Sequence, residues 1–365
     1  MKKILLFLTL CFLSASAIWA AEISFSGETS FSTSVSLPPA DDAWKITKAA
    51  VKQDFELDAY AEGASLNLKA GFDYDAVENE IRPVLSEVYS DFFLGSLAFR
   101  FGRQKATWGN AEILSAVDVI TPSNLTDPIE GEKLAIDALK VSYDAFPYAF
   151  ELYWIPLFTP AAIPSVLIPI IKPETKLENG EVGVKASAYT SAGDFALYGY
   201  YGWEDQPSVH GEYPALHGEY DRLIMAGFSA AVPVGEVTLK AETGWYPKRD
   251  EVLSAMAGIE WLKDDFKIIG EISGSWDKEK EKLSGQIGTA FSYDFLDGDL
   301  SASVSGILEL GDYDGAILAG VDYSFTDELM VSAKVVYLFE GPDGPGTYGS
   351  YKNLDCVKLK AVYSY

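Results

Sequence analysis

The sequence predicts an all-β fold, a transmembrane antiparallel up-and-down β-barrel of about eighteen strands. Sixteen strands are the alternative, if two weak strands near Val84 and Tyr220 do not form. Three observations predict this fold. Apolar and polar residues alternate in segment after segment, short and long connections alternate between these segments, and an export signal is present without an apolar stretch long enough for a membrane helix.

The chain begins with the pattern of a secretory signal peptide. Lys2 and Lys3 precede an apolar run at residues 4–13 and a mostly small-residue stretch at residues 14–21. The apolar run is too short to span a bilayer as a helix, which needs about 20 residues. We expect residues 1–21 to be a cleaved signal peptide, with cleavage after Ala20 or Ala21 and Ala17 as an alternative. Residues 22–365 then form a single barrel domain.

Composition excludes several classes of protein. The formal net charge of -26 argues against nucleic acid as a partner. Hydrophobic residues make up 48% of the chain and aromatic residues 13%, which is too apolar for a disordered protein. After signal cleavage Cys356 is the single cysteine, so a disulfide framework is excluded.

The last nine residues show the strand pattern most clearly. Val357, Leu359, Ala361, Tyr363 and Tyr365 fall on one face, and the residues between them fall on the other. The same period of two recurs at residues 23–35, 54–59, 66–74, 97–101, 237–245, 266–276, 283–293 and 329–339. A soluble sandwich alternates in the same way, so this pattern alone does not separate the two architectures.

The connections favour the barrel. Long connections are expected at residues 37–50, 75–83, 104–134, 156–181, 204–219, 247–251, 277–281, 309–314 and 341–351. Short turns are expected around residues 62–63, 94–95, 146–147, 192–193, 234–235, 263–264, 297–298 and 326–327, and aromatic residues gather beside them. Short periplasmic turns, long outer loops and aromatic girdles are typical of bacterial outer-membrane barrels, whose strand number is even.

The polar face of the strands carries charges of both signs. Asp54, Glu56 and Asp58 form an acidic ladder, whereas Arg100, Lys358 and Lys360 belong to a basic set. Closure of the barrel would place the last strand close to the first, so Lys358 and Lys360 are expected about one strand from the ladder. Opposed rows would suit a water-filled pore with a transverse field. In the alternative, the charges pair and plug the lumen, but eighteen strands enclose more space than side chains fill.

The connection at residues 104–134 is unusually long and carries a recognisable pattern. The pattern consists of Phe101-Gly102-Arg103-Gln104, Trp108-Gly109, Asp118-Val119-Ile120-Thr121-Pro122-Ser123-Asn124-Leu125 and Asp127-Pro128, followed by Tyr153-Trp154-Ile155-Pro156-Leu157-Phe158-Thr159-Pro160. It resembles a porin-like outer-membrane β-barrel family. The resemblance implies that this loop enters the lumen, with a constriction lined by Arg103, Trp108, Asp118 and Asp127. In the alternative, Arg103 and Trp108 only attach the loop to the rim.

The final residues resemble a second feature of such barrels. Tyr363 and Tyr365 are similar to the C-terminal signal that the outer-membrane assembly machinery reads, in which the last residue is more often Phe. The resemblance implies that the assembly machinery and outer-membrane lipid are partners of this chain. A homo-oligomer is left open.

Two further segments raise other functions. Residues 156–180 are apolar and rich in proline, which excludes a long helix and suggests either a docking patch for an apolar solute or packing on neighbouring loops. His210 and His217 are the only histidines, and their spacing is unlike that of dedicated metal sites. No catalytic set can be assigned around them. We therefore expect no enzyme activity, no cofactor and no bound metal.

These observations together predict a diffusion channel for small hydrophilic solutes in the outer membrane of a diderm bacterium. The acidic excess suggests a preference for cations. The alternatives are a non-conducting surface barrel that acts as an adhesin or binds host or matrix, and a transporter of apolar compounds.

Overall fold

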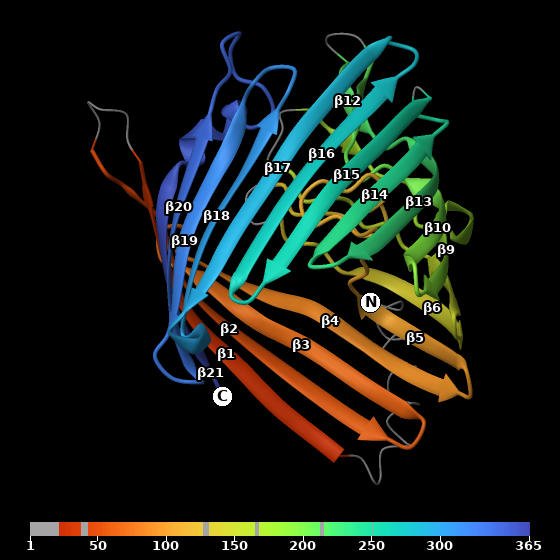
Figure 1. The fold of residues 1–365 in the computed structure, drawn as a ribbon, viewed down its shortest axis with the longest axis horizontal. Coiled ribbons are helices and arrows are strands. Elements are labelled where there is room, and N and C mark those ends of the chain that lie inside the picture. The colour runs from red at the N-terminus through yellow and green to blue at the C-terminus, as the bar shows by residue number, and fades with distance from the viewer. Residues whose placement is uncertain (1–21, 38–42, 127–130, 165–167, 212–214, 250) are drawn as a thin grey trace.

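The computed structural model describes residues 22–37, 43–126, 131–164, 168–211, 215–249 and 251–365. The predicted signal peptide and Asp127 lie outside the described residues. The period of two in the sequence appears as eighteen antiparallel strands that pair in chain order and enclose a lumen (Figure 1). The barrel strands are β1 (Glu22–Ser36), β2 (Ile46–Ala61), β3 (Ala64–Asp75), β4 (Glu80–Leu94), β5 (Leu97–Gln104), β6 (Ile136–Ala145), β7 (Tyr148–Ile155), β9 (Glu181–Thr190), β10 (Gly193–Trp203), β13 (Arg222–Val234), β14 (Val237–Tyr246), β15 (Val252–Lys263), β16 (Phe266–Asp277), β17 (Lys282–Phe295), β18 (Leu300–Glu309), β19 (Gly315–Ser324), β20 (Leu329–Phe339) and β21 (Cys356–Ser364).

The predicted fold class and the count of about eighteen strands are confirmed. Both strands that the sequence left in doubt are present, since Val84 lies within β4 and β13 begins two residues after Tyr220. Within the described residues, no helix has the length and apolar character needed to cross a membrane. The helical turns are the short 3-10 segments η1 (Leu177–Asn179), η2 (Leu296–Gly298) and η3 (Gly349–Leu354).

The barrel closes between its first and last strands. In the β1–β21 register Val35 pairs with Val357, and Thr29 pairs with Tyr363. The pairing continues to the last residue, because Gly27 N–H donates to the Tyr365 carbonyl at 2.9 Å and Tyr365 N–H donates back at 3.0 Å. The alternating sequence at the chain end is therefore the strand that removes the open edges of the sheet.

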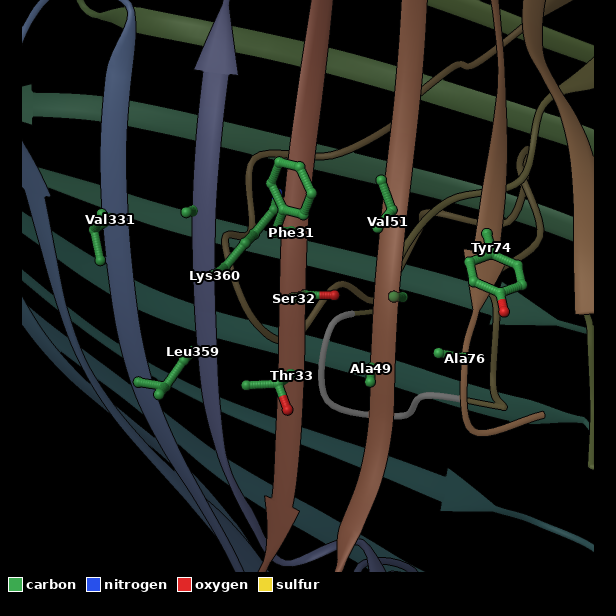
Figure 2. A pocket seen from close by; sticks show the side chains of 12 residues that line it. Phe31, Ser32, Thr33, Ala49, Val51, Tyr74, Ala76, Val331, Leu359 and Lys360 are labelled. Carbon is green, nitrogen blue, oxygen red and sulfur yellow. The ribbon is translucent and has the colours of Figure 1, made fainter. Parts of the chain in front are cut away.

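The apolar residues of the strands face outward and are exposed. Figure 2 shows this outer face at the closing seam, where Phe31, Val51, Tyr74 and Leu359 project from four adjacent strands. Small side chains between them, including Ala49, leave a shallow apolar groove of about 470 Å³. An exposed apolar belt of this kind is what a lipid-facing barrel requires.

The two ends of the barrel differ in their connections. At one end the turns have two to four residues, as between β2 and β3 or between β17 and β18. At the other end they range from four residues between β3 and β4 to the 31 residues 105–135 between β5 and β6. The predicted long loop at residues 75–83 is wrong, because β3 and β4 extend into this range, pair Asp75 with Glu80 and leave a turn of four residues. Hairpin pairing there overrides the turn-like composition of the segment.

The long loops pack on one another above the barrel. Strand β8 (Ile170–Ile171) pairs with β12 (His217–Glu219), which pairs with β11 (Ser208–His210), in a small separate sheet. Phe158 of the proline-rich segment contacts Tyr220 and Trp203, with ring centroids 4.9 and 6.4 Å apart. Of the two interpretations of that segment, packing on neighbouring loops agrees with these contacts.

Candidate functional site: the inserted loop and the lumen wall

The connection at residues 105–135 is called the inserted loop below, and its described residues, 105–126 and 131–135, fold into the barrel and pack against its inner wall (Figure 1). Trp108 is 1% exposed. Its ring lies 5.3 Å from the ring of Tyr198 and 6.2 Å from those of Tyr153 and Tyr200, measured between centroids. These tyrosines belong to β7 and β10, so an aromatic cluster fixes the beginning of the loop to the lumen wall.

Glu242 of β14 holds the middle of the loop by its backbone. Its carboxylate is 0% exposed and accepts hydrogen bonds from the N–H groups of Asn110, Ala111 and Ala116 and from the Ser115 hydroxyl. A buried carboxylate is costly unless such donors surround it. Hydrogen bonds to a charged acceptor contribute about 1.5–3 kcal/mol each. Glu242 therefore anchors one turn of the loop to the wall.

Glu271 of β16 provides a second anchor of the same kind. It is 3% exposed and accepts hydrogen bonds from the N–H groups of Glu112 at 2.8 Å, Ile113 at 2.9 Å and Leu114 at 2.8 Å. The loop has no regular strand or helix here to satisfy its own donors. The two carboxylates supply the missing acceptors and determine where the loop lies in the lumen.

A network of ion pairs lies beside these anchors. Lys240 Nζ lies 3.1 Å from Glu112 of the loop and 2.7 Å from Glu260 of β15. Lys267 Nζ is 3.4 Å from Glu260. Because charges of both signs come from the loop and from three adjacent strands, the network resists displacement of the loop along the barrel axis.

Asp118 lies near the middle of the inserted loop. It accepts a hydrogen bond from Trp108 N–H at 3.1 Å and lies 3.3 Å from Lys133 Nζ. Burial raises the pKa of Asp118, and Lys133 opposes this shift. Between this part of the loop and strands β14 to β17 there is a polar cavity of about 580 Å³, whose lining includes Arg249 and Lys282. Asp118 thus lines this cavity.

Arg103 lies on the outer face of the barrel. It lies on the same face of β5 as Phe99 and Phe101, and its side chain is 3.6 Å from Asp137, its register partner on β6. The prediction that Arg103 lines a constriction is therefore wrong. Its placement follows from strand parity, since a strand turns successive side chains to opposite faces.

Arg100 lies on the lumen face but is engaged by the wall. It donates two hydrogen bonds to Asp91, at 2.8 and 2.9 Å, and stacks over Tyr89 at 3.9 Å from the ring centroid. Such a bidentate and stacked guanidinium is held rigidly. The structure thus brings Trp108 and Asp118 together and leaves Arg100 and Arg103 elsewhere on the wall.

The acidic ladder of β2 also has partners. Asp54 lies 3.0 Å from Lys52, and Glu56 lies 2.9 Å from Lys69. The Asn67 amide donates to Glu56 and to Asp58. Much of the ladder's charge is therefore balanced within its own wall.

Lys358 and Lys360 are separated from the ladder by β1, as predicted, but they lie at another level of the barrel. Lys360 pairs with Ser32 and Lys358 with Ser34. Asp54 instead pairs with Glu28, nearer the end with short turns. The charges are divided along the barrel axis, with lysines toward the outer mouth, rather than placed in rows that face each other across the lumen.

The remaining candidates show no arrangement for chemistry. His210 and His217 face each other on β11 and β12 with ring centroids 6.2 Å apart, and His210 Nε2 is 3.5 Å from Asp221. In the part of the chain that the structure describes, no group of three or more metal-ligating side chains is suited to a metal ion.

Sequence reasoning did not identify Glu242 and Glu271 as site residues. Each appears in the sequence as an ordinary polar residue on the inward face of an alternating strand. Their partners are backbone N–H groups more than a hundred residues earlier in the chain. The sequence carries no signal for these contacts, because the donors are backbone N–H groups, which almost any residue type can supply.

Comparison with known proteins supports the fold. No known family model matches the sequence, and a search of curated proteins found no match either. Acinetobacter baumannii OccAB3 has a similar structure, with a TM-score of 0.60 at 7% identity over 95% of this chain and 99% of that one. Pseudomonas aeruginosa OccK2 (OpdF) gives a TM-score of 0.59 at 8% identity, over 95% and 97%. OccK2 in complex with glucuronate gives 0.58 at 8% identity, over the same shares. At these identities the likeness shows a shared barrel fold.

Proposed function

We propose that this protein is an outer-membrane channel for the passive diffusion of small hydrophilic solutes, narrowed by the inserted loop. One observation carries the proposal, namely a loop fixed inside an eighteen-stranded barrel by Glu242 and Glu271. A barrel of this size is too wide for side chains alone to fill, so the loop sets the width of the passage.

The outer-membrane location has independent support. The barrel carries an exposed apolar belt, with aromatic residues such as Phe266 and Tyr293 next to the short turns. The N-terminal sequence has the pattern of a secretory signal peptide, which agrees with export. A protein of the same fold, OccK2, has been solved with glucuronate, which is a small hydrophilic solute.

The polarity of the lumen favours a diffusion channel over the other functions. Inward-facing ion pairs such as Lys140 with Glu151, 2.9 Å apart, suit a hydrated passage and oppose the entry of apolar compounds. For small ions, the net charge of -26 favours a weak preference for cations through the field at the two mouths. Catalytic activity and a cofactor have no part in the proposal.

Single-channel recording of the mature protein, residues 22–365, in a planar bilayer tests the proposal. Stable open steps are expected, together with a reversal potential under a salt gradient that favours cations. Deleting Lys105 to Asp127 should give larger steps, because the narrowing segment is removed. Silence from protein that is demonstrably folded would overturn the channel and leave a non-conducting surface barrel. Unchanged conductance in the deletion variant would overturn the role of the loop.

A further inference from the structure

The polar cavity beside the inserted loop has a wall that carries hydroxyl groups. Ser254, Ser275 and Ser284 occupy one level of β15, β16 and β17, because each lies opposite the next in the pairing register. These strands lie side by side (Figure 1), and the serines are near the end with the long connections. All three serines line the cavity, whose volume is about 580 Å³. Small-molecule sites usually have about 300–1,000 Å³, so this cavity can hold a small solute.

The three serines face the lumen because the residues next to them face outward. Leu253, Trp276 and Leu283 each adjoin one serine along the strand and are exposed on the outer belt. Successive side chains of a strand point to opposite faces, so the serines belong to the inner face.

The serine hydroxyls retain the capacity to bind a solute. The hydroxyls of Ser254 and Ser275 are hydrogen-bonded to each other at 2.7 Å. A hydroxyl has one donor and two acceptor sites, so this pair still offers one O–H and several lone pairs. Ser284 donates to the Ser275 carbonyl over a long distance of 3.5 Å, and its oxygen can still accept. The wall therefore presents donors and acceptors without a net charge.

The charged side chains at the edge of the cavity have partners of opposite sign. Asp277 accepts a hydrogen bond from Lys280 Nζ at 2.9 Å and lies opposite Lys282 in the register. Arg249 Nε lies 3.7 Å from a carboxylate oxygen of Glu204. An ionic solute would gain little from charges that their neighbours already balance, and it would lose hydration on entering.

The inserted loop forms the opposite side of the cavity. Asp118 of the loop lines it and is engaged by Lys133 and by Trp108 N–H. Val119 of the loop and Val252 of β15 add apolar surface to the lining. The cavity thus combines uncharged hydroxyls, balanced charges and a small apolar area.

We propose that this cavity is a binding subsite for uncharged polyhydroxylated solutes, with a monosaccharide as the simplest occupant. Sugar hydroxyls both donate and accept hydrogen bonds, as the hydroxyls of the serine wall do. The C–H groups of a sugar ring match the apolar area at Val119 and Val252. A few placed polar groups in such a pocket fix the orientation of the solute and give specificity.

The subsite deepens the proposed channel function and rests on it, because it names the class of solute that the narrowed passage takes. The cavity lies between the inserted loop and the wall, within the part of the lumen that the loop narrows. A sugar held there occupies part of the passage and reduces the current of small ions.

Partial block of the ion current by glucose tests the subsite in a planar bilayer. Wild-type current should fall with added glucose and reach a plateau. In Ser254→Ala/Ser275→Ala the half-blocking concentration should rise about tenfold, because two hydrogen-bonding groups are lost. Ser284→Ala, which breaks only the long contact to Ser275, is a milder second variant with a smaller rise in the same direction.

Ser292→Ala/Ser303→Ala is the matched control for these recordings. The two serines lie opposite each other on β17 and β18, on the lumen face, and do not line the cavity. This variant should keep the wild-type block, and it also measures the general effect of glucose on conductivity. The absence of block in a conducting wild type, or equal block in all variants, overturns the subsite.

The class of solute is tested in the same recordings. Glucuronate has a carboxylate where glucose has its primary alcohol, and it should block only at higher concentration. If glucuronate blocks at the same or a lower concentration than glucose, the assignment to uncharged solutes is wrong.

Saturation-transfer NMR in detergent separates this inference from the channel proposal, because it needs no current. Glucose should receive magnetisation from the wild type and from the control variant, and less from Ser254→Ala/Ser275→Ala. Equal transfer from the three proteins would overturn the subsite even if the channel conducts. The expected pattern from a folded barrel that carries no current would overturn only the channel.

Discussion

Strands β14 to β16 and strands β20, β21, β1 and β2 have the same alternation of apolar and polar residues, yet their inward charges have different partners. On the first wall Glu242 and Glu271 are buried and saturated by backbone N–H groups of the inserted loop. On the second wall Lys334 and Lys358 lie opposite each other and face the lumen. The first wall uses its charges to position a segment of the chain, whereas the second places two lysines opposite each other on adjacent strands.

The difference shows why alternation predicts a barrel but does not predict which wall holds a loop. Both walls satisfy their backbone groups in the sheet and turn charges inward. The walls differ in whether they can accept hydrogen bonds from the inserted loop. This long irregular segment needs acceptors for its backbone N–H groups, and acidic side chains supply them whereas lysine side chains do not. An acidic wall is therefore suited to anchoring a loop, and a basic wall repels its N–H groups.

The largest effect is expected from removing both anchors. Glu242→Gln/Glu271→Gln keeps the side-chain size but turns amide N–H groups toward loop donors, which costs about 1–3 kcal/mol for each donor left unpaired. The loop should leave the wall, so conductance should approach that of the loop deletion and protease should cleave within residues 105–126. Glu151→Gln is the control, because Glu151 is a lumen carboxylate whose partners, Lys140 and Tyr153, belong to the barrel wall and not to the loop. Wild-type conductance in the double variant would show that the loop is held by other contacts.

Truncation of Trp108 tests the aromatic end of the same anchor. Trp108→Ala removes a ring that is 1% exposed among three tyrosines, and it should lower the free energy of unfolding by about 3–5 kcal/mol. Trp44→Ala is the matched control, since Trp44 is 61% exposed and its loss should change that free energy by about 0.5 kcal/mol or less. Thermal unfolding in detergent measures both variants. Equal losses in the two would mean that the cluster adds no stability.

The closing seam on the second wall predicts a smaller effect, on assembly. A Cβ at position 27 would lie 2.5 Å from the ring of Tyr365, so Gly27→Val must displace the terminal aromatic residue, at about 1–3 kcal/mol. We expect a smaller fraction of the refolded protein to form the barrel, measured as the heat-modifiable species in gel electrophoresis. Gly306→Val is the control, because its added Cβ would have its nearest neighbour at 3.5 Å. If both variants assemble equally well, the seam does not depend on close packing at Gly27.

The fold could be predicted from the sequence because its signals are local and repeated. Val357 to Tyr365 show the apolar face of a strand that ends the chain, and the structure pairs that strand with β1. The error at residues 75–83 arose where turn-type residues extend a hairpin, which only cross-strand pairing decides. Pairing partners are not encoded in a single segment, so strand ends are less predictable than strands.

The site was only partly predictable. The loop enters the barrel, as the family resemblance implied, but Trp108 is buried against the wall, as in the alternative that it only attaches the loop. Arg103 was assigned to the lumen although its parity with Phe99 and Phe101 already indicated the outer face. Glu242 and Glu271 could not be identified, since their role depends on where a distant loop comes to rest. The sequence pattern predicts which face of a strand a side chain lies on, whereas the role of that side chain depends on its tertiary contacts.

The smallest effect is expected from Asp205, in the connection above the first wall. Burial, together with the negative charge of the nearby Glu181, raises its pKa to about 7. The unfolded chain has a carboxyl pKa of about 3.9, so the folded protein binds more protons between these values. The stability that neutral Asp205 contributes is complete below about pH 4 and is lost as the pH rises through about 7. Asp205→Asn should therefore reduce the fall in unfolding temperature between pH 5 and pH 8, whereas the exposed Asp312→Asn should not. Identical pH slopes in wild type and Asp205→Asn would show that Asp205 is ionised throughout this range and that its pKa is not raised.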